Sequence, residues 1–522
     1  MASRRDELNA YTFAKRRTVA AFLQPSATGT EEGAPRPLRA IVPGMVVGAL
    51  VLAGFGAWGM FKPNAPKGWD TPGTRVIVGK DSTTRYVVLT TGSGKHRKTL
   101  LHPVLNLASA RLLLTPQQFE VIQVSDEILD AGKPPRGPIL GIPYAPDRLP
   151  TAKDAGTAKR WAVCQQPGGN GHGTQTAAFV LADREAGLTE GPRRLTDGQV
   201  LYVQGPDKAR YLVDAAGIRY AIGGPKEDRE TLTRALVGDG RPQQVTAEWL
   251  DTLRSGTPVE FPALPGRPGE DAKVSGLATA DNRVGMVLRA QTGSGPQHYV
   301  VLPGKVSPVS EFTAWLLINS PATDRLDMAG RARDVDLQSI DPGRSAFAGD
   351  ARWPQRKAEQ VNRTKAAAGS GTSRSELRDT VCNVLREVDS KGRPTLSTWA
   401  GTGFPVDITA TGTSTYVTPG TGLLYTQVRG TQSRPDGSLF LLTDTGLRYA
   451  MQANGDSDAD LSEIGAGENK GKDEDGRPEP SQAQIRLGYE KVVPVLVPMA
   501  WSEFLSKGPR LDTNSARQPQ GS

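Results

Sequence analysis

The longest uninterrupted hydrophobic stretch of the chain runs from Ile41 to Phe61 and lies between Arg39 and Lys62. It contains no charged residue. A helix rises about 1.5 Å per residue, so a stretch of about 21 residues reaches about 30 Å, the thickness of the hydrocarbon core of a bilayer. The pattern therefore predicts one transmembrane helix at residues 41–61.

Residues 1–40, which precede this stretch, carry more basic than acidic side chains. Because Lys and Arg resist translocation, this segment is expected in the cytoplasm and the region after residue 61 outside the plasma membrane. A cleaved signal peptide fits poorly, since its apolar core is shorter and follows a brief basic start. We therefore expect the helix to remain in the protein as its single anchor.

Beyond residue 62 the hydrophobic positions come in short runs separated by turn residues, and no second run has spanning length. Gly and Pro contribute 59 and 40 of the 522 residues, and only 6% of the chain is aromatic. This composition favours short strands and turns over long helices. We predict a large α+β domain, rich in β-structure, that folds in water outside the membrane.

This exterior region repeats itself. Residues 211–222 match residues 440–451, and both copies are predicted to form a strand, a tight turn and a second strand. Asp followed by Gly two or three places later supplies a turn with positive φ, and apolar alternation resumes after it. A related strand precedes each copy and a short helix follows it, at 199–203 and 245–256 for the first copy and at 421–425 and 497–508 for the second.

A looser pair of repeats begins at residues 75–89 and 283–302, and each leads into an apolar helical stretch. Small units of this kind bury little surface alone, so we predict pseudo-symmetric repeat units packed around a central core. The predicted parts are a repeat-type unit with a linker at 62–135, part of the core at 136–194, repeats at 195–260 and 261–320, a linker and core part containing the second cysteine at 321–415, a repeat at 416–508 interrupted by an acidic insertion at 453–482, and a disordered tail at 509–522.

Charge and metal-binding residue types narrow the function classes. The net charge is +8, but the basic residues are scattered rather than clustered with aromatic side chains, which indicates solvated charge and argues against nucleic-acid binding. Four histidines and two cysteines without a Cys-x-x-Cys spacing make a structural zinc site improbable. We predict no metal and no cofactor.

The only cysteines are Cys164 and Cys382. In a domain exported across a membrane, two cysteines usually pair. A bridge between them would close a loop of about 217 residues and, by the chain-entropy estimate, stabilise the fold by at most about 5 kcal/mol. Its expected role is to join distant halves of the chain.

Three partial motifs resemble catalytic or ligand sites. The segment from Gly73 to Asp81 resembles a phosphate-binding loop but has one residue too many between its glycines, and its apolar middle is typical of a strand. Residues 456–460 lack the turning glycine of a calcium loop, and residues 412–415 lack an identifiable His and Asp partner. The sequence thus predicts no catalytic residue.

Several motifs distributed along the chain carry a family resemblance. They are residues 4–23, the anchor, His102-Pro-Val-Leu-Asn-Leu-Ala-Ser-Ala-Arg-Leu-Leu-Leu114, Gly141-Ile-Pro-Tyr-Ala-Pro-Asp-Arg-Leu-Pro150, Trp161-Ala-Val-Cys164 and Gly-Leu-Arg-Tyr at 446–449. Together they resemble the EccB family, the single-pass component of the type VII (ESX) secretion systems of actinobacteria, over essentially the whole chain.

The resemblance implies repeat units around a core that one disulfide, between Cys164 and Cys382, holds together. It also implies partners: an EccC-type FtsK-like ATPase, the multi-pass EccD, in some systems EccE, and a mycosin protease. ATP hydrolysis has been ascribed to some family members, although this sequence offers no Walker A motif. The resemblance therefore predicts a structural and assembly component, which anchors and oligomerises while another subunit supplies energy.

Within this family, residues 4–23 would be a cytoplasmic helix that docks on partners. Its apolar residues can share one face, with basic residues elsewhere. The alternative is a helix lying on anionic lipid. The candidate docking residues are Leu8, Tyr11, Arg16, Arg17, Val19 and Phe22.

The anchor itself contains Gly44-x-x-x-Gly48 and a row of small residues that includes Ala49 and Ala53. Such residues let membrane helices approach closely, which predicts a packing face and self-association as a dimer or a larger assembly. Ordinary small residues of a membrane helix are the alternative. Two other function classes stay open: a membrane-anchored ATPase or cell-wall-acting enzyme, and a module that binds the cell wall or a ligand.

Overall fold

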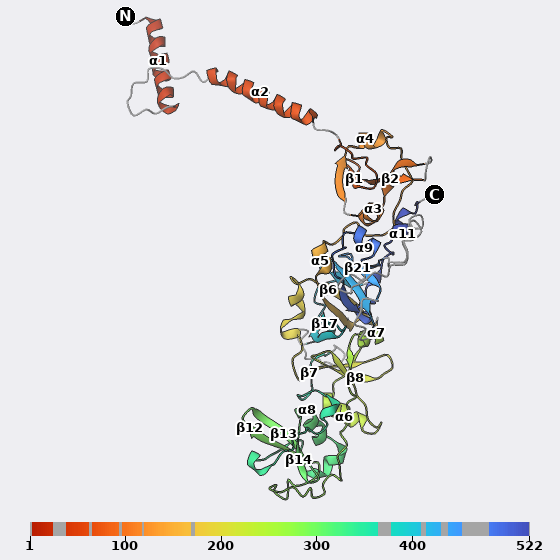
Figure 1. Ribbon diagram of the computed structural model, residues 1–522. Helices are drawn as coiled ribbons and strands as arrows, with labels where there is room; N and C mark the ends of the chain where they lie inside the picture. Colours follow the sequence, from red (N-terminus) through yellow and green to blue (C-terminus); the bar gives the residue numbers. More distant parts are fainter. Residues whose placement is uncertain are drawn as a thin grey trace. The chain divides into compact units, whose positions relative to one another are not determined.

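A computed structural model describes residues 3–23, 38–61, 65–92, 97–116, 119–168, 173–363, 377–408, 414–429, 437–451 and 480–520. The chain forms two compact units. The helical unit comprises Met1–Trp69 and Val124–Ala131, and the strand-rich unit comprises Asp70–Gln123 and Gly132–Ser522. Figure 1 labels the helices and strands of both units.

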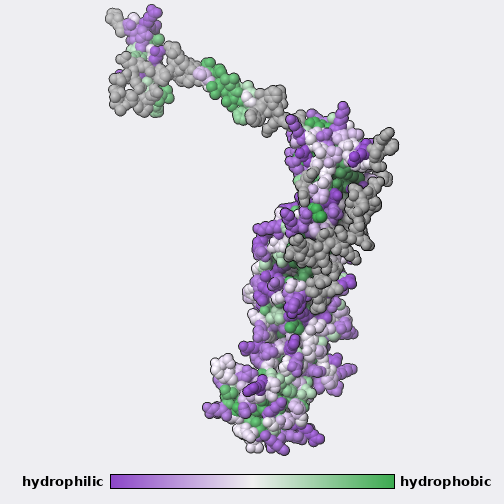
Figure 2. Space-filling view, in the orientation of Figure 1, coloured by the Kyte–Doolittle hydropathy of each residue, from purple (hydrophilic) through white to green (hydrophobic). Residues whose placement is uncertain are grey.

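The helical unit contains α1 (Arg4–Leu23), α2 (Leu38–Phe61) and the short α4 (Asp126–Asp130). Ser3 begins α1, because its hydroxyl and backbone N–H both donate to the Asp6 carboxylate. Hydrophobic colour concentrates along α2 in Figure 2. Within the part of the chain that the structure describes, no helix is both long and apolar enough to cross a membrane. The transmembrane helix therefore stays a prediction.

The first sheet of the strand-rich unit has the order β3-β2-β1-β4. Its strands are β1 (Arg75–Gly79), β2 (Arg85–Thr91), β3 (Lys98–Val104) and β4 (Glu120–Val124). Helix α3 (Leu107–Leu113) follows β3, and the Asn106 side chain caps it by accepting from the N–H of Ser109. Apolar residues of α3 pack against those of β1 and β2 in one buried cluster.

A second sheet has the order β10-β7-β8-β9-β11, in which the three middle strands are antiparallel and the two outer strands pair in parallel. A fourth sheet repeats this arrangement as β23-β20-β21-β22-β24. The strands of the second sheet are β7 (Gln199–Gln204), β8 (Arg210–Asp214), β9 (Ile218–Ala221), β10 (Gln243–Gln244) and β11 (Arg254–Ser255); those of the fourth are β20 (Leu423–Val428), β21 (Leu439–Leu442), β22 (Leu447–Ala450), β23 (Val495–Pro498) and β24 (Ser506–Lys507).

Short helices accompany these two sheets. Helix α7 (Ala247–Asp251) stands before β11, and α10 (Met499–Ser502) stands before β24, at the positions that the sequence predicts. The second sheet also has α6 (Arg229–Val237) and an added parallel strand, β16 (Glu359–Gln360), next to β7.

The third sheet has the order β14-β13-β12-β15 and is followed by a helix. Its strands are β12 (Val287–Thr292), β13 (Gly295–Leu302), β14 (Lys305–Val309) and β15 (Arg333–Asp334). Helix α8 (Glu311–Ile318) begins where the Ser310 hydroxyl accepts from the N–H of Thr313. The apolar residues of α8 are buried against the sheet and against the neighbouring α6 cluster.

A central sheet collects strands that are far apart in the sequence, in the order β18-β17-β5-β6-β19. They are β5 (Arg160–Pro167), β6 (Thr174–Leu181), β17 (Thr380–Val388), β18 (Pro394–Gly401) and β19 (Ser414–Val417). One face packs against apolar residues of the second and fourth sheets in the largest buried cluster. The other face carries a smaller cluster that includes both cysteines.

Two expectations about irregular regions need correction. Residues 509–520 do not form a free tail, because Leu511 is fully buried and α11 (Thr513–Arg517) packs against α3. Within the predicted linker, the described residues 321–363 lack long strands but bury Leu326 and Trp353. Scattered large apolar side chains anchor both segments. The acidic insertion lies almost wholly outside the described residues.

Candidate functional site

The disulfide between Cys164 and Cys382 is present, as predicted. The two cysteines face each other across β5 and β17, with Cα atoms 4.0 Å apart, and neither is exposed. The bridge thus joins neighbouring strands of one sheet rather than two distant bodies. It nevertheless links positions 218 residues apart in sequence, so it closes the long loop predicted for a bridge between these two cysteines.

The second and fourth sheets attach to the face of the central sheet opposite the disulfide. Trp249 of α7 is fully buried, and its indole N–H donates to the Val163 carbonyl of β5 over 2.9 Å. Trp161 of β5 meets the ring of Tyr425 of β20 edge-on, with centroids 5.9 Å apart. Trp501 of α10 lies in the same cluster. Aromatic anchors therefore fix the second and fourth sheets to one face of the core.

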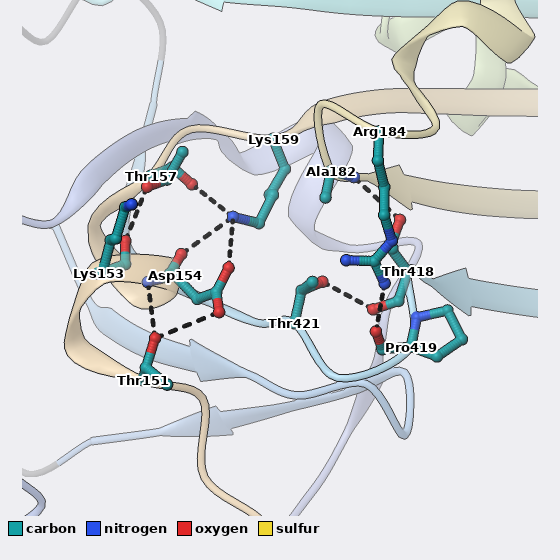
Figure 3. Close-up of polar contacts among 10 residues, drawn as sticks. All are labelled: Thr151, Lys153, Asp154, Thr157, Lys159, Ala182, Arg184, Thr418, Pro419 and Thr421. Carbon is teal, nitrogen blue, oxygen red and sulfur yellow. Dashed lines mark hydrogen bonds and ion pairs between the residues drawn. The ribbon is translucent and has the colours of Figure 1, made fainter. Parts of the chain in front are cut away.

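A polar network holds the segments on either side of the β5–β6 hairpin (Figure 3). The Lys159 ammonium, 2% exposed, donates to the backbone carbonyls of Asp154 and Thr157, each over 3.0 Å, which closes the turn after α5 (Ala152–Gly156). Burial lowers the pKa of Lys159, and the Asp154 carboxylate 3.9 Å away opposes this shift. These contacts satisfy the buried charge, so Lys159 stabilises the fold rather than providing a reactive amine.

The same view shows how β6 is held to the end of β19. The hydroxyl of Thr418 accepts from the N–H of Ala182, and the Arg184 guanidinium donates to the Pro419 carbonyl over 2.5 Å. The Thr421 hydroxyl donates back to the Thr418 carbonyl. Residues more than 230 positions apart are thereby joined through backbone groups.

A second charged cluster lies at β5 and β17, two inner strands of the central sheet. Glu190 accepts from three guanidinium groups, those of Arg160 on β5, Arg386 on β17 and the nearby Arg194. Burial acts to raise the pKa of the Glu190 carboxyl, but the hydrogen bonds from Arg386 and Arg194 hold it below its usual value. The cluster ties the segment after β6 to two strands.

The predicted docking residues lie along α1. Leu8, Tyr11 and Phe22 are 66%, 69% and 89% exposed, and Val19 is 38% exposed. Arg16 and Arg17 are exposed on the same helix. The role of this helix in docking stays a prediction.

The predicted packing residues lie on α2. An added Cβ at Gly44 or Gly48 would meet no described atom within 4 Å, and Ala49 and Ala53 are exposed. The helix therefore presents a row of small residues that no described part of the chain covers.

The phosphate-loop-like segment is a strand, as its apolar middle predicts. Residues of β1 pair with β2 in the register Val76↔Val87 and Val78↔Arg85. The N–H of Gly73 donates to Val88, and that of Gly79 donates to Thr84. Because this backbone is committed to the sheet, its N–H groups are not arranged around a phosphate.

Sequence reasoning missed a cavity of about 420 Å³ beside α8. Its lining comes from three strands, the helix and two loops, which no local motif joins. The one signal in the sequence is Trp315, which interrupts the apolar pattern of α8 with an aromatic side chain that has a polar edge. Its indole N–H donates to the Ala235 carbonyl, and Trp315 lines the cavity.

Comparison with known proteins gives one family and a shared fold. The model of the family described as "Type VII secretion system ESX-1, transport TM domain B" matches residues 1–521. A Mycobacterium tuberculosis protein named "ESX-2 secretion system ATPase EccB2" is 32% identical over 280 residues, which are 52% of this chain and 50% of that protein. The chain thus spans about half the length of the first curated relatives it matches.

Two solved structures share the fold. One, described as an intact ESX-5 inner membrane complex, aligns with a TM-score of 0.56 at 18% identity and covers 100% of this chain and 96% of its own. The other, described as an EccB3 dimer from the ESX-3 core complex, aligns with a TM-score of 0.55 at 22% identity and covers 85% and 99%. The fold of small sheets on a β-rich core is therefore that of these proteins.

Proposed function

The chain belongs to the EccB family of type VII secretion systems, and from this membership we propose that it is a structural and assembly component of a type VII secretion membrane complex. The match of the family model over residues 1–521 is the observation that carries the proposal. The architecture supports it, because buried aromatic anchors and a disulfide serve to hold sheets together rather than to perform chemistry. Deleting this chain from cells should leave the remaining membrane components unassembled on native gels.

We further propose that the protein is anchored in the plasma membrane by α2, with α1 in the cytoplasm and the strand-rich unit outside. The uncharged sequence from Ile41 to Phe61 and the basic residues before it support this topology. The buried disulfide supports it as well, since disulfides persist in oxidising compartments.

The partners that we propose are an EccC-type FtsK-like ATPase, EccD, EccE where the system has one, and a mycosin protease. Helix α1 is the proposed docking element for the cytoplasmic partners. Its exposed Leu8, Tyr11 and Phe22 support this role, because exposed large apolar side chains that gather on one helix are typical of a binding face. Self-association is proposed too, since a solved structure of similar fold is described as a dimer.

The packing face on α2 gives a specific test of assembly. Replacing Gly44 and Gly48 together by Leu should reduce the yield of the complex on native gels several-fold, because the larger side chains separate helices that small residues let approach. Replacing Leu50 and Leu52 by Ile is the matched control and should leave the yield unchanged. An unchanged yield with the paired Leu substitutions would remove the packing role.

We also propose that the four small sheets are two pairs of repeats, the first with the third and the second with the fourth. The second and fourth sheets support this most strongly, because their strand orders and directions agree. Gly217 and Gly446 support it in detail, since each occupies the positive-φ position of the turn between equivalent strands.

ATP hydrolysis is the second candidate function, and it is favoured by the word "ATPase" in the names of the relatives. The strand at Arg75–Gly79 argues against a phosphate loop at the one segment that resembles it. Steady-state ATP hydrolysis is measured on the purified chain with and without the substitution Lys80→Ala. If ATP hydrolysis persists in the variant, it does not depend on this segment.

A further inference from the structure

The cavity beside α8 has the dimensions of a small-molecule site. Its volume of about 420 Å³ falls within the range of ligand pockets, and it lies wholly in the strand-rich unit. Strands β12, β13 and β15 form one side, α8 forms another, and the loop at 330–332 and Lys357 complete the lining.

The charges around the cavity leave an excess of basic groups. Arg289 and Asp334 neutralise each other in a two-pronged ion pair, with N–O distances of 2.6 and 3.0 Å. The second acid, Glu311, lies 3.8 Å from the Arg356 guanidinium. Arg331 is exposed, and its guanidinium has no acidic partner among the residues that the structure describes. An anion is therefore better matched to this lining than a cation.

An aromatic wall and an imidazole complete the site. The Lys357 ammonium lies 3.3 Å from the centroid of the Trp315 ring. It adds positive charge to the lining and occupies the position over the ring that a cationic ligand would take. Ala314 and Ile318 continue the apolar wall along the same helix. His298 is half-buried, and burial lowers the pKa of its imidazole, so the neutral ring offers one N–H donor and one acceptor.

We propose that this cavity binds a small organic carboxylate, whose apolar part packs on Ala314 and Ile318 and whose carboxylate is held by Arg331. The site is separate from the assembly surfaces proposed above and does not depend on them. It makes the strand-rich unit a receptor for a small anion as well as a scaffold.

Benzoate and benzamide are the probes that test this site, because they share one ring and differ in charge. Binding to the purified full-length chain is measured by calorimetry and by saturation-transfer NMR. Benzoate should bind saturably with a Kd of about 1 mM, and benzamide at least about tenfold more weakly, since only the carboxylate makes a charge-assisted hydrogen bond.

Arg331→Gln should raise the benzoate Kd about tenfold or more, whereas the matched control Arg333→Gln should change it less than about twofold. Arg333 is two residues away but pairs with Asp281 and does not line the cavity. Circular dichroism checks that both variants fold. Equal binding of benzoate and benzamide, an unchanged Kd in Arg331→Gln, or no saturable binding of benzoate to the unaltered chain would each overturn the proposal. Preferential binding of benzylamine would overturn it in favour of a cation site.

Discussion

Replacing both Cys164 and Cys382 by Ala should lower the free energy of unfolding of the strand-rich unit by about 2–5 kcal/mol. The bridge joins positions 218 residues apart, so its loss releases a very long loop in the unfolded chain. Both side chains are also fully buried on one face of the central sheet, where two small cavities would remain. Urea unfolding followed by tryptophan fluorescence measures the effect.

Two controls separate the covalent link from the side-chain change. Reduction of the unaltered protein under partly denaturing conditions should shift the unfolding midpoint to lower urea in the same direction as the double substitution. Adding reductant to the double variant should then have no further effect. An unfolding midpoint that is the same with and without the bridge would show that the central sheet does not depend on it.

Trp249→Ala should destabilise the strand-rich unit by about 3–5 kcal/mol. The side chain is fully buried between the second sheet and the central sheet, so its removal leaves a large cavity at the junction. The substitution also removes the donor to the Val163 carbonyl. The effect is measured by urea unfolding, and exposure of the junction is measured by limited proteolysis around β7 and β8.

Trp249→Phe is the matched control for this prediction. It keeps most of the apolar volume and loses the indole N–H, so it should cost about 1–3 kcal/mol, less than Trp249→Ala. If both variants unfold at the midpoint of the unaltered protein, Trp249 does not anchor the second sheet to the core.

The hairpins of the exterior were predictable because their chemistry is local. Asp214 ends β8, and its carboxylate accepts from the N–H groups of Ala216 and Ile218. Gly217 then adopts φ +69°, which a side chain would strain. Asp444 and Gly446 occupy the corresponding turn of the fourth sheet. The spacing of Asp and Gly and the apolar alternation around it carry this information directly.

The sequence predicted that a central core exists, but it did not predict the order of the strands in the central sheet. Its strands come from residues 160–181, 380–401 and 414–417, and nothing in a local pattern states that β17 pairs with β5. Cys164 and Cys382 gave the one long-range clue, because a disulfide requires its two strands to approach. Without it, pairing across such a separation depends on the packing of the whole unit.

The same limit explains the errors at the end of the chain and beside α8. Residues 509–520 look polar, but a few apolar residues such as Leu511 and Ala516 fill a gap beside α3. Similarly, Arg331 lies in the loop before β15, and Trp315 lies on α8. The two residues line one cavity only in the folded unit. Buried contacts between distant segments decide both features.

Affinity purification in mild detergent tests the assembly role most directly. The full chain carries a C-terminal tag, and a matched chain carries the tag with Leu8, Tyr11 and Phe22 replaced by Ser on α1. The unaltered chain should recover a secretion ATPase and a multi-pass membrane protein in constant proportion, and the α1 variant should recover much less of both. Recovery of the tagged chain alone, from membranes in which those partners are present, would contradict its proposed role in a type VII secretion complex.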